Sequence, residues 1–417
     1  MPQLTVLPTA QTEPDTLTAH NYHRTLDAVY RAAVQTGLPV ALWRQPRQQE
    51  KEAVVDFSGV ARPTKIDFTR RWPGFAFAPF VNAQGKATLF INAGLHLNRA
   101  GHHFLTPLPK AQQPNKTRFL AAYHAQTLAP SERAPRWETA PSPLTGATAG
   151  QAEFCRLVDE AIAYIKATDI KKIVASRATE ISLPAPFNPL TTFDALCRAY
   201  RRAFVSLVSI PGAGTWMGAS PELLLSLTGA GLRTVALAGT QARPGDATPL
   251  PEVRWGDKEI EEQALVSDYI RRFFKDLGLQ TFAEVGPRTV SAGNVVHLQT
   301  EFTVQRDALT LRRLANQILD NLHPTSAVCG MPKKEALSFI LEKEKYNRAF
   351  YSGFLGPVHL NDQSHLFVNL RCMQLKRRSA LLYVGAGITQ DSVPQAEWQE
   401  TVLKSNTLLS IVRPTPA

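Results

Sequence analysis

Two pairs of glutamates with the same spacing are the first candidates for chemistry in this sequence of 417 residues. Glu259 and Glu262 lie three residues apart, as do Glu397 and Glu400, and Lys404 follows four residues after the second pair. In an α-helix this spacing places both carboxylates on one face. A single such pair is usually a solvated helix face, because glutamate is rarely buried. Together the two pairs also fit a hard-cation site, since Mg²⁺ binds carboxylate oxygens, but periodicity alone does not bring the two helices together.

A lysine and a glutamate beside apolar strands are candidates for acid–base chemistry. Lys172 opens an otherwise apolar run, where it is either a solvated strand end or a desolvated general base. Glu222 follows a turn and precedes three leucines, a position where a carboxylate is not expected in the core. If the two side chains faced each other across a pocket, they would form an acid–base pair. The sequence does not supply the distance between them.

Two glycine-rich segments, Gly212-Ala-Gly-Thr-Trp-Met-Gly218 and Gly385-Ala-Gly387, match neither the dinucleotide-binding fingerprint nor the P-loop. We interpret both as backbone turns at strand ends, with close approach of a ligand as the second interpretation.

Hydrophobic periodicity predicts alternating helices and strands, the pattern of an α/β protein. Residues 20–35 predict a helix that is followed by a strand at 40–43. Residues 129–150 are rich in Pro, Ala, Thr, Ser and Gly without an apolar period, so we expect a linker there. We therefore expect an N-terminal subdomain at 1–150 within the same globular unit and a catalytic region at 151–417. In that region we predict helices at 151–167, 259–277, 310–321 and 395–411, and a strand that begins at Lys172.

The composition limits the possible partners. The 46 Lys and Arg residues exceed the 35 Asp and Glu residues, which gives a formal net charge of +11. Basic residues occur as scattered doublets, such as Arg201-Arg202, so we expect an anionic small molecule rather than a nucleic acid. No apolar run approaches the roughly 18 residues that span a bilayer, and no membrane association is expected. Four separated cysteines without Cys-x-x-Cys spacing, and no signal-peptide pattern, favour a cytoplasmic protein with reduced thiols and no zinc.

Ten segments between Gln151 and about Val412 resemble, in the same order, the chorismate-utilising enzymes, which include isochorismate, salicylate, anthranilate and aminodeoxychorismate synthases. Residues 1–150 match only loosely, and no site residue is placed there. The resemblance implies an α/β (α+β) fold of antiparallel sheets with surrounding helices, like that of anthranilate synthase component I. The segments are Lys172-Ile-Val-Ala-Ser-Arg177, Gly218-Ala-Ser-Pro-Glu222, Leu237-Ala-Gly-Thr240, Asp257-Lys-Glu-Ile-Glu-Glu262-Gln-Ala-Leu-Val266, Val296-His297-Leu298, His323-Pro-Thr-Ser-Ala-Val-Cys-Gly330-Met-Pro332, Tyr346-Asn-Arg348-Ala-Phe-Tyr-Ser-Gly353, Asn369-Leu-Arg371-Cys372, Gly385-Ala-Gly-Ile388 and Glu397-Trp-Gln-Glu400-Thr-Val-Leu-Lys404.

The resemblance implies a Mg²⁺ cofactor and two groups of residues around chorismate. Glu262 and Glu400 match the family's direct Mg²⁺ ligands, with Glu259 and Glu397 as further or water-mediated ligands. The metal would hold the ring carboxylate of chorismate. The expected substrate-binding positions are Arg371 and Lys404 for the enolpyruvyl carboxylate, His297 beside the ring carboxylate, the segments Ala238, Gly239, Thr240 and Gly385, Ala386, Gly387, and a ring-pocket wall of Thr325, Ser326 and Ala327.

The choice of subfamily depends on the nucleophile. In the family members that add water, the lysine at position 172 would deprotonate water for attack at C2, and the acid at 222 would protonate the departing C4 hydroxyl. Anthranilate synthases have glutamine at the position of Lys172, and aminodeoxychorismate synthases have a nucleophilic lysine where this chain has Ala238. Salicylate synthases keep the same lysine and glutamate, so the pair does not exclude them.

The sequence therefore predicts an isochorismate synthase, an isomerase that supplies menaquinone or siderophore biosynthesis, the choice of pathway being open. Salicylate synthase is the alternative, and a non-catalytic anion-binding protein on the same fold is the remote one. The expected partner is chorismate alone, with no obligatory glutamine amidotransferase subunit, and a monomer is expected.

Overall fold

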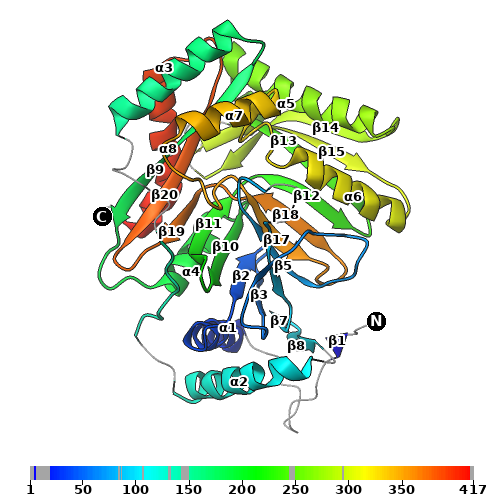
Figure 1. The fold of residues 1–417 in the computed structure, drawn as a ribbon, viewed down its shortest axis with the longest axis vertical. Coiled ribbons are helices and arrows are strands. Elements are labelled where there is room, and N and C mark those ends of the chain that lie inside the picture. Colours follow the sequence, from blue (N-terminus) through cyan, green and yellow to red (C-terminus); the bar gives the residue numbers. More distant parts are fainter. Residues whose placement is uncertain are drawn as a thin grey trace.

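Two antiparallel β-sheets, packed face to face, form the centre of the molecule, and helices cover their outer faces (Figure 1). This computed structural model describes residues 4–5, 19–82, 85, 87–105, 108–129, 133–141, 150–243, 249–293 and 295–413. Within these residues each paired strand runs antiparallel to its neighbours, as in the ladders of β20 with β9 and of β13 with β15. The expected α/β (α+β) fold of antiparallel sheets with surrounding helices is confirmed.

The first sheet contains eleven strands among the described residues. Its longest ladder pairs β9 with β20, from Ile173 opposite Ile388 to Ser182 opposite Ser379. In spatial order the strands are β1 (Leu4–Thr5), β8 (Gly101–Leu105), β7 (Leu95–Asn98), β3 (Lys51–Val55), β2 (Val40–Arg44), β10 (Phe204–Ile210), β11 (Gly214–Ser220), β19 (Cys372–Leu375), β20 (Ser379–Ile388), β9 (Lys172–Ser182) and β16 (Gly330–Met331).

The second sheet contains nine strands among the described residues. In spatial order they are β14 (Ala283–Ala292), β15 (Val295–Val304), β13 (Gly231–Ala242), β12 (Leu223–Thr228), β18 (Ser364–Val368), β17 (Phe354–Val358), β5 (Gly74–Ala78), β6 (Leu89–Asn92) and β4 (Arg62–Pro63). Strands from the first 105 residues thus extend both sheets.

Helices pack on the outer face of each sheet. On the first sheet lie α1 (Ala19–Gln35), α2 (Gln113–Leu128), α3 (Gln151–Ala167), α4 (Pro189–Ala199), α7 (Lys333–Lys343) and α8 (Pro394–Val412). On the second sheet lie α5 (Asp257–Asp276) and α6 (Ala308–Leu322). Local signals set several starts: the side chains of Asn188 and Asp307 cap α4 and α6 by accepting hydrogen bonds from backbone N–H groups of the first turn.

Aromatic side chains from both sheets fill the space between them. Trp43 of the first sheet meets Phe75 of the second with ring centroids 5.3 Å apart, and Trp216 meets Phe77 at 6.2 Å. All four are buried, and each such ring buries roughly 150–250 Å². This shared core fixes one sheet against the other and so fixes the side chains where their ends meet.

The helices predicted at 151–167, 259–277, 310–321 and 395–411 are confirmed within two residues at each end as α3, α5, α6 and α8. Of the expected linker at 129–150, residues 130–132 and 142–149 lie outside the described residues. Residues 133–141 form neither helix nor strand, and the indole N–H of Trp137 donates to the Lys376 carbonyl at 3.1 Å. Within the described residues, no helix is both long and apolar enough to cross a membrane. The four cysteines are free thiols.

A buried arginine ties the segment after α7 to the first sheet. Arg348 is 2% exposed, and its guanidinium donates two hydrogen bonds to the Glu344 carboxylate, at 2.7 and 2.5 Å. It also donates to the carbonyls of Val328 at 2.9 Å and of Val174 at 2.7 Å. Because Val174 belongs to β9, Arg348 holds this segment against the strand that begins with Lys172.

Replacing this arginine should destabilise the protein. We expect Arg348→Ala to lower the free energy of unfolding by about 3–5 kcal/mol, because the Glu344 carboxylate is left buried without its cation. Urea denaturation followed by circular dichroism measures the change. Lys345→Ala is the control: the Lys345 side chain is 79% exposed and pairs with Glu153 at 3.3 Å, so its loss should cost below about 1 kcal/mol. Equal losses in the two variants would contradict a special role for the buried pair.

Candidate active site

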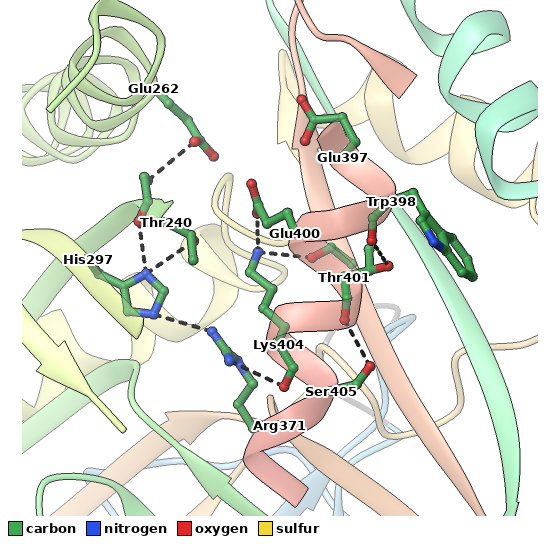
Figure 2. Close-up of polar contacts among 12 residues, drawn as sticks. Thr240, Glu262, His297, Arg371, Glu397, Trp398, Glu400, Thr401, Lys404 and Ser405 are labelled. Atoms are coloured by element: carbon green, nitrogen blue, oxygen red, sulfur yellow. Dashed lines mark hydrogen bonds and ion pairs between the residues drawn. The ribbon is translucent and has the colours of Figure 1, made fainter. Parts of the chain in front are cut away.

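A cavity lies where the ends of the two sheets meet helices α5 and α8 (Figure 2). Eleven of the residues predicted from the sequence line it. They are Glu222, Ala238, Gly239, Thr240, Glu262, His297, Ala327, Arg371, Gly385, Gly387 and Lys404. The other lining residues are Val174, Pro221, Leu237, Val328, Tyr351, Leu370, Tyr383 and Val384.

A buried ion pair joins the first sheet to α5. Lys172, the first residue of β9, is fully buried, and its Nζ lies 2.8 Å from Oε1 of Glu262. Burial would raise the pKa of Glu262, but the ammonium groups of Lys172, Lys404 and Lys258 outweigh it and hold that pKa below its usual value. Lys172 is thus a desolvated side chain rather than a solvated strand end. It lies behind the cavity lining, against Glu262 and Gly387.

The glycines of β20 make room for this pair. A Cβ at Gly387 would lie 2.4 Å from Oε1 of Glu262 and 2.9 Å from Cε of Lys172. A Cβ at Gly385 would lie 2.9 Å from the hydroxyl of Tyr351. The interpretation of this segment as a turn was therefore wrong: both residues are inside a strand, and close approach of other groups explains the glycines.

Some predicted positions do not face the cavity. Ala386 is fully buried and packs in the apolar core with α3, because alternate side chains of a strand point to opposite faces. Ser326 is 1% exposed and does not line the cavity. Gly212 does lie in the turn between β10 and β11, and Gly214 begins β11, with φ of +82° and +80°, whereas Gly218 lies inside β11.

Glu222 is a buried carboxyl group beside the cavity. It is 3% exposed, and its Oε1 accepts a hydrogen bond from the Thr325 hydroxyl at 3.2 Å. Burial raises the pKa of Glu222 to about 7, although Thr325, Lys172 and Lys404 act in the opposite direction. A carboxylic acid with a pKa of about 7 keeps a substantial protonated fraction at neutral pH and can donate a proton, which is the behaviour expected of a general acid. The placement of Glu222 in the core differs from the sequence expectation of a solvated position.

Arg371 and Lys404 bring positive charge to the cavity, and His297 lies beside the arginine (Figure 2). His297 Nδ1 donates to the Gly239 carbonyl at 2.8 Å, so its Nε2 accepts from Arg371 at 3.3 Å. Burial and then the charge of Arg371 lower the pKa of His297 to about 3, which keeps the imidazole neutral. Burial also lowers the pKa of Arg371 to about 10, which leaves it charged at neutral pH. Lys404 donates to the Gly385 carbonyl at 3.0 Å.

Arg371 is held in place by its backbone and by α8. Its φ of +48° is in the left-handed region, which is uncommon for a residue other than glycine and is often found at functional sites. Its guanidinium donates to the Thr407 hydroxyl at 3.1 Å and to the Lys404 carbonyl at 3.4 Å. The guanidinium is thereby oriented by two residues of α8 as well as by His297.

Three of the four predicted metal carboxylates converge. Figure 2 shows Glu262 of α5 and Glu397 and Glu400 of α8 turned toward the same space. Together these three carboxylates outweigh burial and raise the pKa of Lys258, which lies 2.5 Å from Glu397 Oε1. Lys404 lies 2.5 Å from Glu400 Oε1.

Glu259 is placed differently, because it is half-buried and its carboxylate folds back toward Gly256 at the start of α5. Of the four predicted metal carboxylates, Glu262 lines the cavity, whereas Glu259, Glu397 and Glu400 do not.

The carboxylates of Glu262, Glu397 and Glu400 are chemically suited to bind a hard cation. In the described part of the chain, no three His, Cys, Asp or Glu side chains already lie close enough to hold a metal ion. However, Glu397 is 1% exposed, its Oε2 has no hydrogen-bond partner, and burial and then the charge of Glu400 raise its pKa. A buried carboxylate oxygen without a partner beside two further carboxylates is a set of ligands that suits Mg²⁺.

Lys258 and Tyr351 are among the polar residues near the site that were not selected from the sequence. Lys258 precedes Glu262 by four residues, so helical spacing could have placed the two side chains on one face. Tyr351 lines the cavity and lies within the segment Tyr346–Gly353 that carries the family resemblance, but no role was assigned to it.

Comparisons with known proteins identify what this chain is similar to. The sequence profile of a family described as chorismate binding enzyme matches residues 68–413. Isochorismate synthase EntC of Escherichia coli (strain K12) is 28% identical over 269 residues, which cover 63% of this chain and 67% of EntC. The chain thus spans about two thirds of that relative.

Two solved structures show the same fold. One is MenF, the menaquinone-specific isochorismate synthase from Escherichia coli, with a TM-score of 0.74, 23% identity and coverage of 99% of this chain and 95% of MenF. The other is anthranilate synthase component I from Streptococcus pneumoniae TIGR4, with a TM-score of 0.61, 17% identity and coverage of 90% of each chain.

The raised pKa of Glu222 predicts a specific dependence of stability on pH. A carboxyl group with a pKa of about 7 in the folded protein and an ordinary value of 4.5 binds its proton more tightly when folded. This contribution is fully present below pH 4.5 and is lost as pH rises toward and through about 7. At about 1.4 kcal/mol per pKa unit, the loss amounts to roughly 3 kcal/mol.

We expect the free energy of unfolding of the natural protein, minus that of Glu222→Gln, to fall between pH 4.5 and 7 and to level off above. Urea denaturation at several pH values measures it, and the subtraction cancels the other titrating groups. Parallel curves for the two proteins would show that Glu222 titrates normally.

Proposed function

The chain belongs to the chorismate-binding enzyme family, and on that premise we propose that it is an isochorismate synthase. It would be an isomerase that adds water at C2 of chorismate and releases the C4 hydroxyl. The observation that carries the proposal is the buried carboxyl of Glu222, whose pKa burial raises to about 7, at a cavity that Arg371 and Lys404 also line. The names of the relatives EntC and MenF, both isochorismate synthases, support the same activity.

The cationic side of the cavity suits the enolpyruvyl carboxylate of chorismate. Arg371 presents a planar guanidinium that can pair with a carboxylate through two hydrogen bonds. Lys404 adds a second positive charge, and neutral His297 holds Arg371 without competing for the anion. These groups would hold the substrate so that its ring lies between Glu222 and Lys172.

Mg²⁺ would be held by Glu262, Glu400 and Glu397, and when bound it would neutralise the ring carboxylate of the substrate. The ion pairs of Lys172 with Glu262 and of Lys404 with Glu400 support the proposal, because they indicate that these carboxylates attract positive charge.

The two proton transfers would be divided between Lys172 and Glu222. Lys172, in its neutral form, would take a proton from water as the water oxygen bonds to C2 and the ring double bond shifts. Glu222 would give its proton to the C4 hydroxyl, which leaves as water. Because Lys172 lies behind Glu262, its amine must separate from that carboxylate to meet the attacking water.

Other nucleophiles are disfavoured by the residues around the ring. Ala238 offers no side-chain amine, and its backbone N–H donates to Gln263 at 2.9 Å. We propose that the enzyme acts in the cytoplasm as a monomer and without an amidotransferase subunit, and that its product enters menaquinone or siderophore synthesis.

The identity of the product tests this function. With chorismate and Mg²⁺, we expect an equilibrium mixture of chorismate and isochorismate with no pyruvate released, because the enolpyruvyl ether stays intact. Liquid chromatography identifies the products, and lactate dehydrogenase with NADH reports pyruvate. Stoichiometric pyruvate and salicylate would instead identify a salicylate synthase.

Lys172→Gln is the matched variant for that assay. We expect its kcat to be roughly 10²–10⁴-fold lower than that of the natural protein, which is the typical effect of losing a general base. Ordinary turnover by this variant would remove the lysine from the mechanism.

Removal of the metal or of its ligands should also abolish turnover. We expect no activity with excess EDTA, recovery on adding Mg²⁺, and loss of activity in Glu262→Gln and Glu400→Gln with the fold intact by circular dichroism. The expectation follows from the carboxylates that converge between α5 and α8. Near-normal activity of either variant at limiting Mg²⁺ would show that its glutamate is not a ligand. Glu261→Gln, on the exposed face of α5, is the control and should behave as the natural protein.

A further inference from the structure

A second cavity, with a volume of about 1260 Å³, adjoins the site cavity. Pro221 and Arg371 line both, so the two cavities meet at the arginine proposed to receive a substrate carboxylate. We call this second cavity the arginine cleft, because eight arginines line it within the described residues: Arg47, Arg198, Arg201, Arg202, Arg233, Arg243, Arg288 and Arg371.

The charge of the arginine cleft is strongly unbalanced. Three carboxylates line it among the described residues, and each already has a partner. Glu50 pairs with Arg99 at 3.1 Å, and Glu52 contacts His96 at 2.8 Å. Glu301 is shared by Arg233 and Arg288, at 3.5 and 3.8 Å. Among the described residues that line the cleft, arginines therefore outnumber carboxylates eight to three.

Three arginines at the rim carry much of this excess. Arg47 lies between β2 and β3, Arg198 in the last turn of α4, and Arg202 in the turn before β10. All three are exposed and line the cleft, and in the part of the chain that the structure describes none pairs with a carboxylate. Their charges thus act on whatever enters the cleft.

We propose that the arginine cleft is the entrance through which the dianionic substrate is drawn to Arg371. The inference rests on the proposed function, because it takes chorismate as the ligand. The groups that would bind substrate are buried, Arg371 at 7% and His297 at 5% exposure, so a substrate must pass through an opening to reach them. A cleft lined by one sign of charge with low-dielectric walls focuses the electric field and raises the association rate of an oppositely charged ligand.

The test compares two triple variants that remove the same charge. Arg47→Gln, Arg198→Gln and Arg202→Gln together neutralise the rim of the cleft. Arg156→Gln, Arg272→Gln and Arg313→Gln neutralise three exposed arginines on α3, α5 and α6 that do not line it. The association rate constant of chorismate with the Mg²⁺-loaded protein is measured by stopped-flow fluorescence over a range of salt concentrations. Steady-state kcat is measured alongside.

In the rim variant we expect association to be roughly 3–10-fold slower at low salt, with kcat unchanged and the difference gone at about 0.5 M salt, where the screening length falls to a few ångströms. The control variant should match the natural protein within about twofold. If the rim triple folds poorly, Arg202→Glu alone, in an exposed turn, should give the same salt-dependent slowing.

Equal association rates in the rim and control variants at low salt would contradict the proposal that the arginine cleft is the entrance for the substrate. Calorimetry of chorismate with the natural protein separates the two proposals. No binding at all would overturn the proposed function and the entrance with it, whereas normal binding with unaltered rates overturns the entrance only.

Discussion

The buried ion pair between Lys172 and Glu262 is the interaction on which the site depends. Lys172 belongs to the first sheet, whereas Glu262 belongs to α5, which packs on the second sheet, so the pair links the two halves of the sandwich. Removing each charge from water costs several kcal/mol unless a partner compensates it. Keeping Glu262 beside Lys172 also requires a glycine at position 387 of β20, because any side chain there would occupy the space of the Glu262 carboxylate.

Two buried carboxyl groups near the cavity differ in protonation because their neighbours differ. Glu262 has an ammonium at 2.8 Å and two more nearby, so it stays charged in spite of its burial. Glu222 receives one hydrogen bond from a neutral hydroxyl, so burial dominates and its pKa rises to about 7. One fold thereby keeps a carboxylate suited to a cation and a carboxylic acid suited to proton donation, a division that the sequence alone leaves open.

The parts of the fold that were predictable from the sequence are those with a strong local pattern. The stripe of Phe154, Val158, Ala161 and Ile165 predicted α3 with the bounds that the structure has, because one face of this helix is buried. Strand β14 was missed because its residues are exposed or half-buried and show no apolar alternation. Helix α4 was missed although the Asn188 cap and the proline that follows it are recognisable start signals.

The site was predictable to a similar extent. The resemblance selected most of the residues that line the cavity, but the purpose of the glycines in β20 depends on a carboxylate that lies more than 100 residues earlier in the chain. Likewise, the side chain of Ala386 faces the core because side chains alternate along a strand. The resemblance selected Gly385, Ala386 and Gly387 together and so did not show which of them face the cavity.

The basic charge of the chain shows why distribution in space matters more than distribution in sequence. Doublets such as Arg201-Arg202 are scattered along the chain and form no stripe of the kind that binds nucleic acid. The two sheets nevertheless bring arginines from the β2–β3 loop, the end of α4, and strands β13 and β14 to a single concave surface. Because this surface is a cleft that ends at a buried arginine, its charge acts on a ligand small enough to reach that end. The geometry therefore favours a small dianion over a polymer, and the same field that draws the anion inward also strengthens its pairing with Arg371.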